Sequence, residues 1–280
     1  MGRKSSLLIF VVFMCFNAWA QPQATVYEGE IGISAGLAHY FGDLNNRAAL
    51  NRPKMAIGAF YRKQVGNYIG VRLGFHYARL GYSDIYSKNE FQQTRNLSFN
   101  TAMWEVALQG DFNFFKFEPG NPDHMFTPYV TLGFGVFGYD PYAFLDGEKY
   151  FLRPLGTEGQ GSSMYPDRQF YGNTAFCFPL GMGIKYNINP SLNFAFEVAY
   201  RFTNTDYLDD VSTTYAGPSA FTPQSPAFFL QDRSYEKGTP IGVAGRQRGF
   251  SSQRDQYVII EASLSFVLTS YRCPTPRRQY

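Results

Sequence analysis

The chain has 280 residues, with 25 Lys and Arg against 22 Asp and Glu, and 18% of its residues are aromatic. Two basic residues fall in the signal segment described next, so the charge is close to balanced. No basic cluster interleaved with aromatic residues occurs before the C-terminal tail, which excludes a nucleic-acid-binding protein. Beyond the N-terminal segment, no apolar run approaches the roughly 20 residues that a transmembrane helix needs.

The first 20 residues are typical of a secretory signal peptide. A basic start is followed by apolar residues 7–16 and by the small-x-small sequence Ala18-Trp19-Ala20, which predicts cleavage between Ala20 and Gln21. The alternative is a transmembrane anchor, but the apolar run is too short to span a bilayer. The predicted mature chain therefore begins at residue 21.

Eight stretches alternate apolar residues with small or polar ones, as expected for strands, in which successive side chains point to opposite sides. In chain order they are residues 27–40, 54–62, 68–78, 97–115, 127–139, 174–188, 192–203 and 257–268. The last is the clearest, since Val258, Ile260 and Leu264 share one face. The pattern predicts an all-β protein.

The connections between these strands run long, short, long, medium, long, short, long. The short ones are residues 64–67 and 189–191, and the longest is residues 204–255. Long loops outside and short turns inside are typical of an outer-membrane barrel with both termini in the periplasm. The Pro and Ser content of residues 204–255 is compatible with partial disorder.

We therefore predict an eight-stranded antiparallel transmembrane β-barrel over residues 21–272, with long extracellular loops, short periplasmic turns and a periplasmic tail at residues 273–280. The 28 Phe and 21 Tyr suit a lipid-facing band and interfacial girdles. A soluble ligand-binding barrel is the alternative, because periodicity does not say which face is outside; the loop asymmetry favours the membrane.

Charged residues on the inward faces predict a plugged barrel rather than a pore. Eight strands leave little interior room. The residues expected to pair across the lumen are Arg72, Lys185 and Arg201 with Glu105, Asp111 and Glu197. Glycines at inward positions of the third, fifth and sixth strands fit the same narrow interior.

No catalytic, cofactor-binding or metal site is predicted. His39, His76 and His124 lie on separate elements without metal-ligand or triad spacing. A second group, Asp206, Asp209 and Asp210, is interpreted as a solvated rim or an Asx-type turn, because it lacks the regular oxygen spacing of calcium loops. Glu158, which lies between Gly156 and Gly159, is interpreted as a turn residue.

The two mature cysteines raise the question of a disulfide, the default for an exported pair. Cys177 lies early in the sixth strand, at its outer end, whereas Cys273 follows the last strand on the periplasmic side, roughly 25–30 Å away. Disulfide Cα atoms must lie within about 7 Å. We expect Cys273 to be unpaired within the chain and to form an intermolecular disulfide or contact with a periplasmic partner; the alternative is an idle thiol.

The tail offers a second pair of candidate contacts. Pro274 and Pro276 keep it extended, and Arg277 and Arg278 are placed to pair with acidic groups of a partner or with lipid phosphates. The alternative is a frayed terminus.

Four segments, in the order and spacing found here, carry a family resemblance: residues 49–54 (ALNRPK), 95–99 (RNLSF), 155–161 (LGTEGQG) and 205–212 (TDYLDDVS). Together with the Cys-Pro after the last strand, they resemble the PorG family, the small outer-membrane barrel of the type IX secretion system of Bacteroidetes. The chain departs from the family in the Pro- and Ser-rich stretch at residues 217–238.

The resemblance implies a non-enzymatic role. It implies association with a periplasmic ring formed by a PorK-like lipoprotein and a PorN-like protein, which the barrel would link to the outer membrane. The alternatives are a barrel enzyme acting on lipid or peptide and a small porin-like channel.

Overall fold

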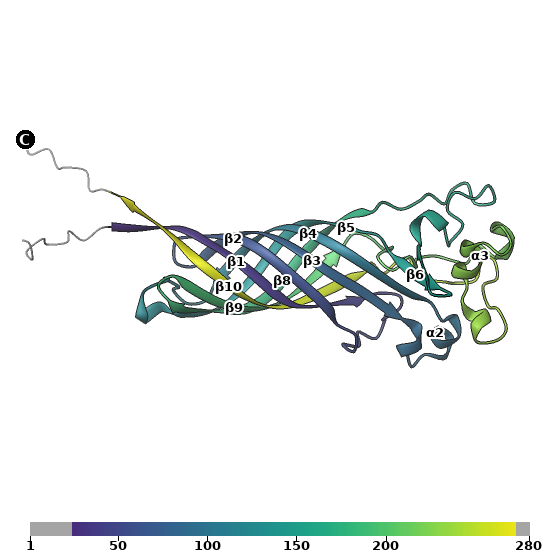
Figure 1. The fold of residues 1–280 in the computed structure, drawn as a ribbon, viewed down its shortest axis with the longest axis horizontal. Helices are drawn as coiled ribbons and strands as arrows, with labels where there is room; N and C mark the ends of the chain where they lie inside the picture. Colours follow the sequence, from purple (N-terminus) through teal and green to yellow (C-terminus); the bar gives the residue numbers. More distant parts are fainter. Residues whose placement is uncertain (1–23, 273–280) are drawn as a thin grey trace, which may run out of the picture. The chain divides into compact units, whose positions relative to one another are not determined.

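The computed structural model describes residues 24–272, and eight long antiparallel strands in it form a closed barrel (Figure 1). The strands are β1 (Ala24–Phe41), β2 (Lys54–Val65), β3 (Ile69–Ser83), β4 (Ser98–Asn113), β5 (Phe126–Tyr139), β8 (Thr174–Asn189), β9 (Leu192–Thr203) and β10 (Gln256–Arg272). Each pairs with its neighbour in the chain, β10 lies beside β1, and β3 pairs with β4. The predicted fold class is confirmed. The predicted signal peptide and the tail after residue 272 lie outside the described residues.

The described chain divides into two compact units. Residues 29–267 hold the barrel wall and all its loops. The second unit contains the strand ends, residues 24–28 and 268–272, where the Ser270 hydroxyl donates a hydrogen bond to the Glu28 carboxylate at 2.7 Å.

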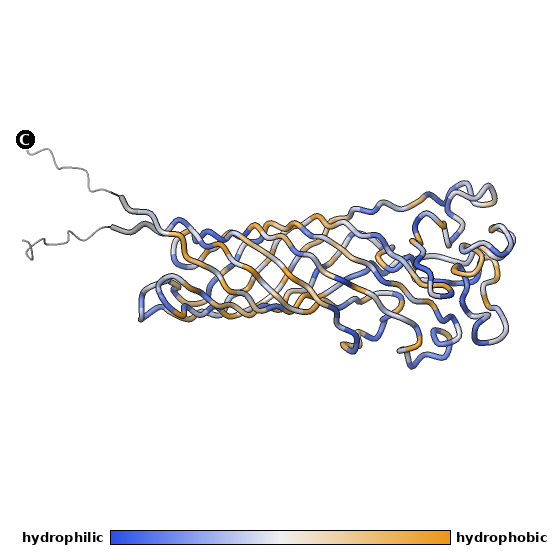
Figure 2. Tube along the Cα trace, viewed as in Figure 1, coloured by the Kyte–Doolittle hydropathy of each residue, from blue (hydrophilic) through white to orange (hydrophobic). Residues whose placement is uncertain are grey.

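The outer face of the barrel is apolar. Exposed side chains include Ile33, Leu73, Leu132 and Met182, each more than half exposed, and Figure 2 shows apolar residues along the barrel wall. A continuous exposed apolar band of this size is stable only against an apolar surround such as lipid. The soluble barrel would have the opposite arrangement and is excluded.

The inner face is polar and its charges are paired. Arg62 contacts Glu30 at 2.7 Å and Asp111 at 2.8 Å, and Lys185 contacts the same Asp111 at 2.9 Å. The Arg72 guanidinium lies 2.7 Å from the Glu197 carboxylate. These side chains come from six strands and are all buried.

A second lumenal group lies around Glu105. Its carboxylate contacts Arg201 at 3.4 Å and His76 at 3.3 Å, and it accepts a hydrogen bond from the Tyr257 hydroxyl at 2.5 Å. Space for such side chains depends on inward glycines: a Cβ on Gly183 would lie 2.8 Å from the Tyr129 ring. The predicted plugged interior matches the structure.

Connections at one end are short, with residues 66–68 joining β2 to β3 and residues 190–191 joining β8 to β9. The third connection there, residues 114–125, contains η3 (Pro122–His124). At the other end lie four long loops: loop 1 (residues 42–53), loop 2 (84–97), loop 3 (140–173) and loop 4 (204–255). The predicted asymmetry is thus present.

The long loops contain their own elements. They are η2 (Asp84–Tyr86), α2 (Glu90–Arg95), β6 (Tyr142–Leu145), β7 (Glu148–Phe151), η4 (Arg153–Leu155), η5 (Pro218–Ala220), α3 (Pro226–Gln231) and η6 (Ser234–Glu236). Within residues 24–272, no helix has the length and apolar character needed to cross a membrane.

Several strand ends and two loops differ from the sequence-based expectation. Strand β3 continues to Ser83, beyond the predicted end at residue 78, because it still pairs with β4 as far as Ser98. Loop 3 contains the unpredicted hairpin β6–β7. Loop 4 is folded rather than partly disordered, since it carries α3 and a dense set of buried polar contacts.

Candidate functional site

We define the cap as loops 1 to 4, together with the elements α2, α3 and β6 that these loops contain. The cap lies at one end of the barrel (Figure 1). Charged residues are buried in the cap, although none of them belongs to a strand of the barrel. They are Asp43, Asp84, Arg95, Glu158, Asp206, Asp209, Asp210, Asp232, Arg248 and Asp255, each no more than 9% exposed. The interpretation of Asp206, Asp209 and Asp210 as a solvated rim is therefore wrong, because all three are buried: Asp206 accepts a hydrogen bond from Ser212, Asp209 from Tyr40 and Asp210 from Thr157. The alternative, an Asx-type turn, is present at Asp209, whose carboxylate also accepts the backbone N–H of Val211.

Glu158 connects loops 3 and 4. Its carboxylate accepts hydrogen bonds from the backbone N–H of Ser212 at 2.9 Å and from the Thr213 hydroxyl at 2.6 Å, and it pairs with Arg248 at 3.2 Å. The flanking Gly156 and Gly159 have φ of 59° and 86°, a left-handed backbone that glycine adopts without strain. The interpretation of Glu158 as a simple turn residue is wrong, because the turn directs a fully buried carboxylate into loop 4.

Asp210 is the second acidic partner of Arg248. Its carboxylate lies 3.7 Å from the guanidinium and accepts hydrogen bonds from the hydroxyls of Thr157 at 2.5 Å and Tyr171 at 2.6 Å. Burial raises the pKa of Asp210 to about 6, although Arg248 acts in the opposite direction. Asp210 has a φ of 67°, a conformation that Asp tolerates better than most residues.

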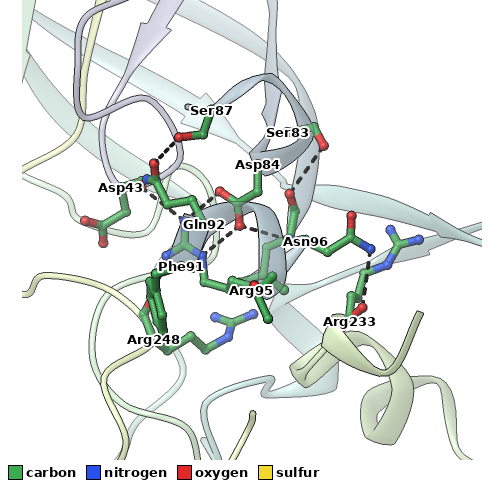
Figure 3. Close-up of polar contacts among 12 residues, drawn as sticks. Asp43, Ser83, Asp84, Ser87, Phe91, Gln92, Arg95, Asn96, Arg233 and Arg248 are labelled. Carbon is green, nitrogen blue, oxygen red and sulfur yellow. Dashed lines mark hydrogen bonds and ion pairs between the residues drawn. The ribbon is translucent and has the colours of Figure 1, made fainter. Parts of the chain in front are cut away.

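Arg95, at the end of α2, joins loops 1, 2 and 4 (Figure 3). Its guanidinium donates to both carboxylate oxygens of Asp84, at 2.7 and 2.8 Å. It also donates to the backbone oxygen of Asp43 at 3.1 Å and to that of Arg248 at 2.5 Å. The short helix is positioned by its N-cap Asn89, whose side chain accepts from the first free N–H groups.

Where β1 enters the cap, Tyr40 joins two acids. Its hydroxyl lies 2.5 Å from the Asp209 carboxylate and 2.9 Å from that of Asp255. Burial and the nearby negative charges raise the pKa of both Asp209 and Asp255. A hydroxyl has a single hydrogen to donate, so both contacts are satisfied when one of the two carboxyls carries a proton. Within residues 24–272, no group of three or more His, Cys, Asp and Glu side chains is arranged to hold a metal ion.

The other residues singled out in the sequence lie apart from the cap network. Cys177 is a free, buried thiol on the lumenal face of β8. His76 lies in the lumen between Glu105 and Glu261, at 3.3 and 3.2 Å, and His124 ends η3 near the short connections. Ala20, Gln21, Cys273, Arg277 and Arg278 lie outside the described residues.

Three of the four segments that carry the family resemblance meet in the cap network. Residues 95–99 supply Arg95, residues 155–161 supply Glu158, and residues 205–212 supply the three aspartates. Arg248 contacts all three segments. Sequence reasoning missed Arg248 because no local motif marks it; the glycine-flanked Glu158 was the one available signal.

Comparison with known proteins identifies a family. The chain belongs to the family described as "Domain of unknown function (DUF6089)", whose model matches residues 6–156, more than half of the chain. No curated protein matches the sequence significantly.

Several solved structures share the barrel fold at low identity. Neisserial surface protein A is 9% identical, with a TM-score of 0.43, over 88% of this chain and 100% of that one. Ail of Yersinia pestis is 12% identical, with a TM-score of 0.39, over 86% of this chain and 99% of Ail. OprG of Pseudomonas aeruginosa is 13% identical, with a TM-score of 0.32, over 89% of this chain and 98% of OprG. Similarity at this level carries no information about function.

Proposed function

We propose that this protein is a non-enzymatic outer-membrane barrel of a type IX protein secretion system, in which it anchors a periplasmic ring to the membrane. The observation that carries the proposal is the meeting of residues 95–99, 155–161 and 205–212 in one buried network. Three segments that resemble PorG in sequence therefore also contact one another in the folded protein. Their contact supports a resemblance of the whole fold and not only of short sequence segments.

The outer-membrane location is supported by the apolar outer face of a closed barrel and by the signal peptide predicted from the sequence. An anchoring role rather than transport is supported by the lumen, where paired charges such as Arg62 and Asp111 occupy the interior. Steady single-channel conductance of the purified protein in a planar bilayer would instead favour a porin-like channel.

The proposed contact side is the periplasmic one, where both termini would lie. Cys273, Arg277 and Arg278 are the candidate contacts with a PorK-like lipoprotein and a PorN-like protein, and Cys273 is a candidate for an intermolecular disulfide. Extended basic tails suit acidic partners or lipid phosphates.

The test is a crosslinked pull-down of the full-length tagged protein from its native outer membrane, combined with a secretion assay in a deletion strain. We expect recovery of the ring proteins, and reduced recovery and secretion for Arg277→Gln with Arg278→Gln and for Cys273→Ser. The matched control is Lys237→Gln with Arg246→Gln, two exposed cations of loop 4. Normal secretion in the deletion strain, with no ring protein recovered, would contradict the proposal.

A further inference from the structure

The end of loop 1 lies against the outer wall of the barrel. His39 belongs to the outward face of β1, between the inward residues Ala38 and Tyr40, yet it is only 3% exposed. Its Nε2 accepts the backbone N–H of Arg52 at 3.2 Å, which holds the end of loop 1 against β1. Figure 1 shows this loop turning away from the strands beside α2. One side of the cap therefore lies at the outer face of the barrel.

A pocket of about 300 Å³ lies between this part of loop 1 and loop 2. Its lining includes two exposed cations, Arg47 and Lys88, and the exposed amides of Asn46 and Asn51. No Asp or Glu lines it. The volume is at the lower end of the range for small-ligand sites.

The cations around the pocket are not neutralised by the protein. Among the described residues, no ion pair involves Arg47, Arg52 or Lys88. Arg52 is placed by stacking on the ring of Tyr86, a pocket residue, at 3.9 Å. The two buried guanidinium groups of the cap, Arg95 and Arg248, in contrast have carboxylate partners. The pocket therefore presents donors suited to an anion, above all to phosphate oxygens.

Apolar residues next to these cations point to a lipid as the source of the anion. Leu50, between Arg47 and Arg52, is 64% exposed, and so is Met55 at the start of β2. Met55 pairs with Leu37, an outward residue of β1, so the apolar surface continues into the barrel band. One more cation, Arg79, extends outward from β3 directly after Ala78, which pairs with Ala56. Positive charge thus lies at the cap end of the apolar band, which is the level of the lipid headgroups.

We propose that this pocket, formed by Arg47, Lys88, Asn46 and Asn51 and flanked by Arg52, binds the phosphorylated headgroup of an outer-leaflet glycolipid of the lipid A type. The phosphates accept hydrogen bonds from Arg47 and Lys88, and the acyl chains lie along Leu50 and Met55. The site requires the proposed outer-membrane location but not the proposed role in secretion.

The test uses the full-length protein purified in detergent and native mass spectrometry to titrate three probes separately: diphosphorylated lipid A, the same lipid without its phosphates, and inorganic phosphate. We expect the protein to retain lipid A with its phosphates and to bind both other probes at least about tenfold more weakly. Arg47→Gln with Lys88→Gln should lower the affinity for lipid A at least about tenfold. The charge-retaining variant Lys88→Arg should bind as the wild type does.

Lys237→Gln with Arg246→Gln provides the control with the same change of charge at another part of the cap. Equal lipid A affinity in the wild type and in Arg47→Gln with Lys88→Gln would overturn the proposal. Equal binding of inorganic phosphate and lipid A would overturn the assignment to a lipid. Both outcomes are measured with the purified protein. They therefore do not depend on the secretion assay, which tests the ring-anchoring role separately.

Discussion

Glu158 and Arg248 form an ion pair at 3.2 Å although they lie 90 positions apart in the chain. Glu158 comes from loop 3 and Arg248 from loop 4, and both side chains are at least 98% buried. A buried ion pair is costly to desolvate, so its main effect is to make one arrangement of the loops much better than its alternatives. We infer that this pair fixes how loop 4 folds over loop 3.

Replacing Glu158 by Gln is expected to loosen the cap. The amide is the same size as the carboxylate, but it leaves Arg248 with only the more distant carboxylate of Asp210, at 3.7 Å. Removing one partner of a buried pair costs about 3–5 kcal/mol. Hydrogen–deuterium exchange should therefore show lost protection in residues 204–255, while the strands of the barrel remain protected.

Glu148→Gln is the matched control, because Glu148 lies on the exposed strand β7 and accepts a hydrogen bond from Tyr150 there. Its effect should stay within about 0.5 kcal/mol. Unchanged protection of residues 204–255 in Glu158→Gln would show that the pair does not hold the loops together.

The barrel was predictable because each strand has to satisfy lipid on one side and a narrow polar lumen on the other. That requirement imposes a period of two, so every predicted strand overlaps an observed one. In β10, Leu264 is exposed on the outer side, whereas Glu261 and Ser265 are buried on the inner side, as expected. Strand ends such as that of β3 were less predictable. The strand continues to pair with β4 beyond residue 78, where polar residues interrupt the apolar alternation.

The cap was not predictable, because its partners are distant in sequence. Asp209 is buried by Tyr40, 169 positions away, and Asp210 by Thr157, 53 positions away. A run of Asp in a loop usually indicates a solvated turn. No feature of the neighbouring sequence predicts that other parts of the chain cover it. The burial follows from tertiary packing alone.

In the lumen, Glu105→Gln is expected to destabilise the barrel. Glu105 faces Arg201 at 3.4 Å and His76 at 3.3 Å, and the substitution leaves these groups without their shared negative charge. The cost should be about 3–5 kcal/mol. A lower urea midpoint for loss of the folded electrophoretic form would report it.

For Glu105→Gln the comparison is Glu118→Gln, since Glu118 pairs with Lys116 in the exposed connection between β4 and β5. That variant should unfold at the wild-type urea concentration. A shared midpoint for both variants and the wild type would mean that the lumenal charges contribute little to stability.

Cys177 is expected to be unreactive in the folded protein. Its side chain is fully buried on the inner face of β8, and its sulfur lies 3.8 Å from the Glu105 carboxylate. Maleimide labelling of a Cys273→Ser protein should therefore be at least tenfold slower in the folded than in the urea-unfolded state. Rapid labelling of the folded variant would mean that the lumen is open to solutes. The complementary Cys177→Ser protein then reports on Cys273 alone, and its non-reducing electrophoresis tests the proposed intermolecular disulfide.

Cap stability is expected to decrease as the pH rises from 5 to 8. Burial raises the pKa of Asp43 and Asp210 to about 6 and that of Asp206 to about 7, from an ordinary value of 3.8. The folded cap therefore binds more protons than the unfolded loops between about pH 4 and 7. Stability from these groups is complete below the unfolded pKa and is lost as the pH rises through the folded pKa.

A difference of one pKa unit between the folded and unfolded states corresponds to about 1.4 kcal/mol, so the change should be measurable. Exchange protection factors for residues 204–255, corrected for intrinsic rates, should be higher at pH 5 than at pH 8. Asp206→Asn should reduce this dependence, because the amide resembles the protonated acid, whereas Asp167→Asn, at an exposed position of loop 3, should leave it unchanged. Protection that increases toward pH 8 would mean that the buried carboxyls are held as anions by their partners.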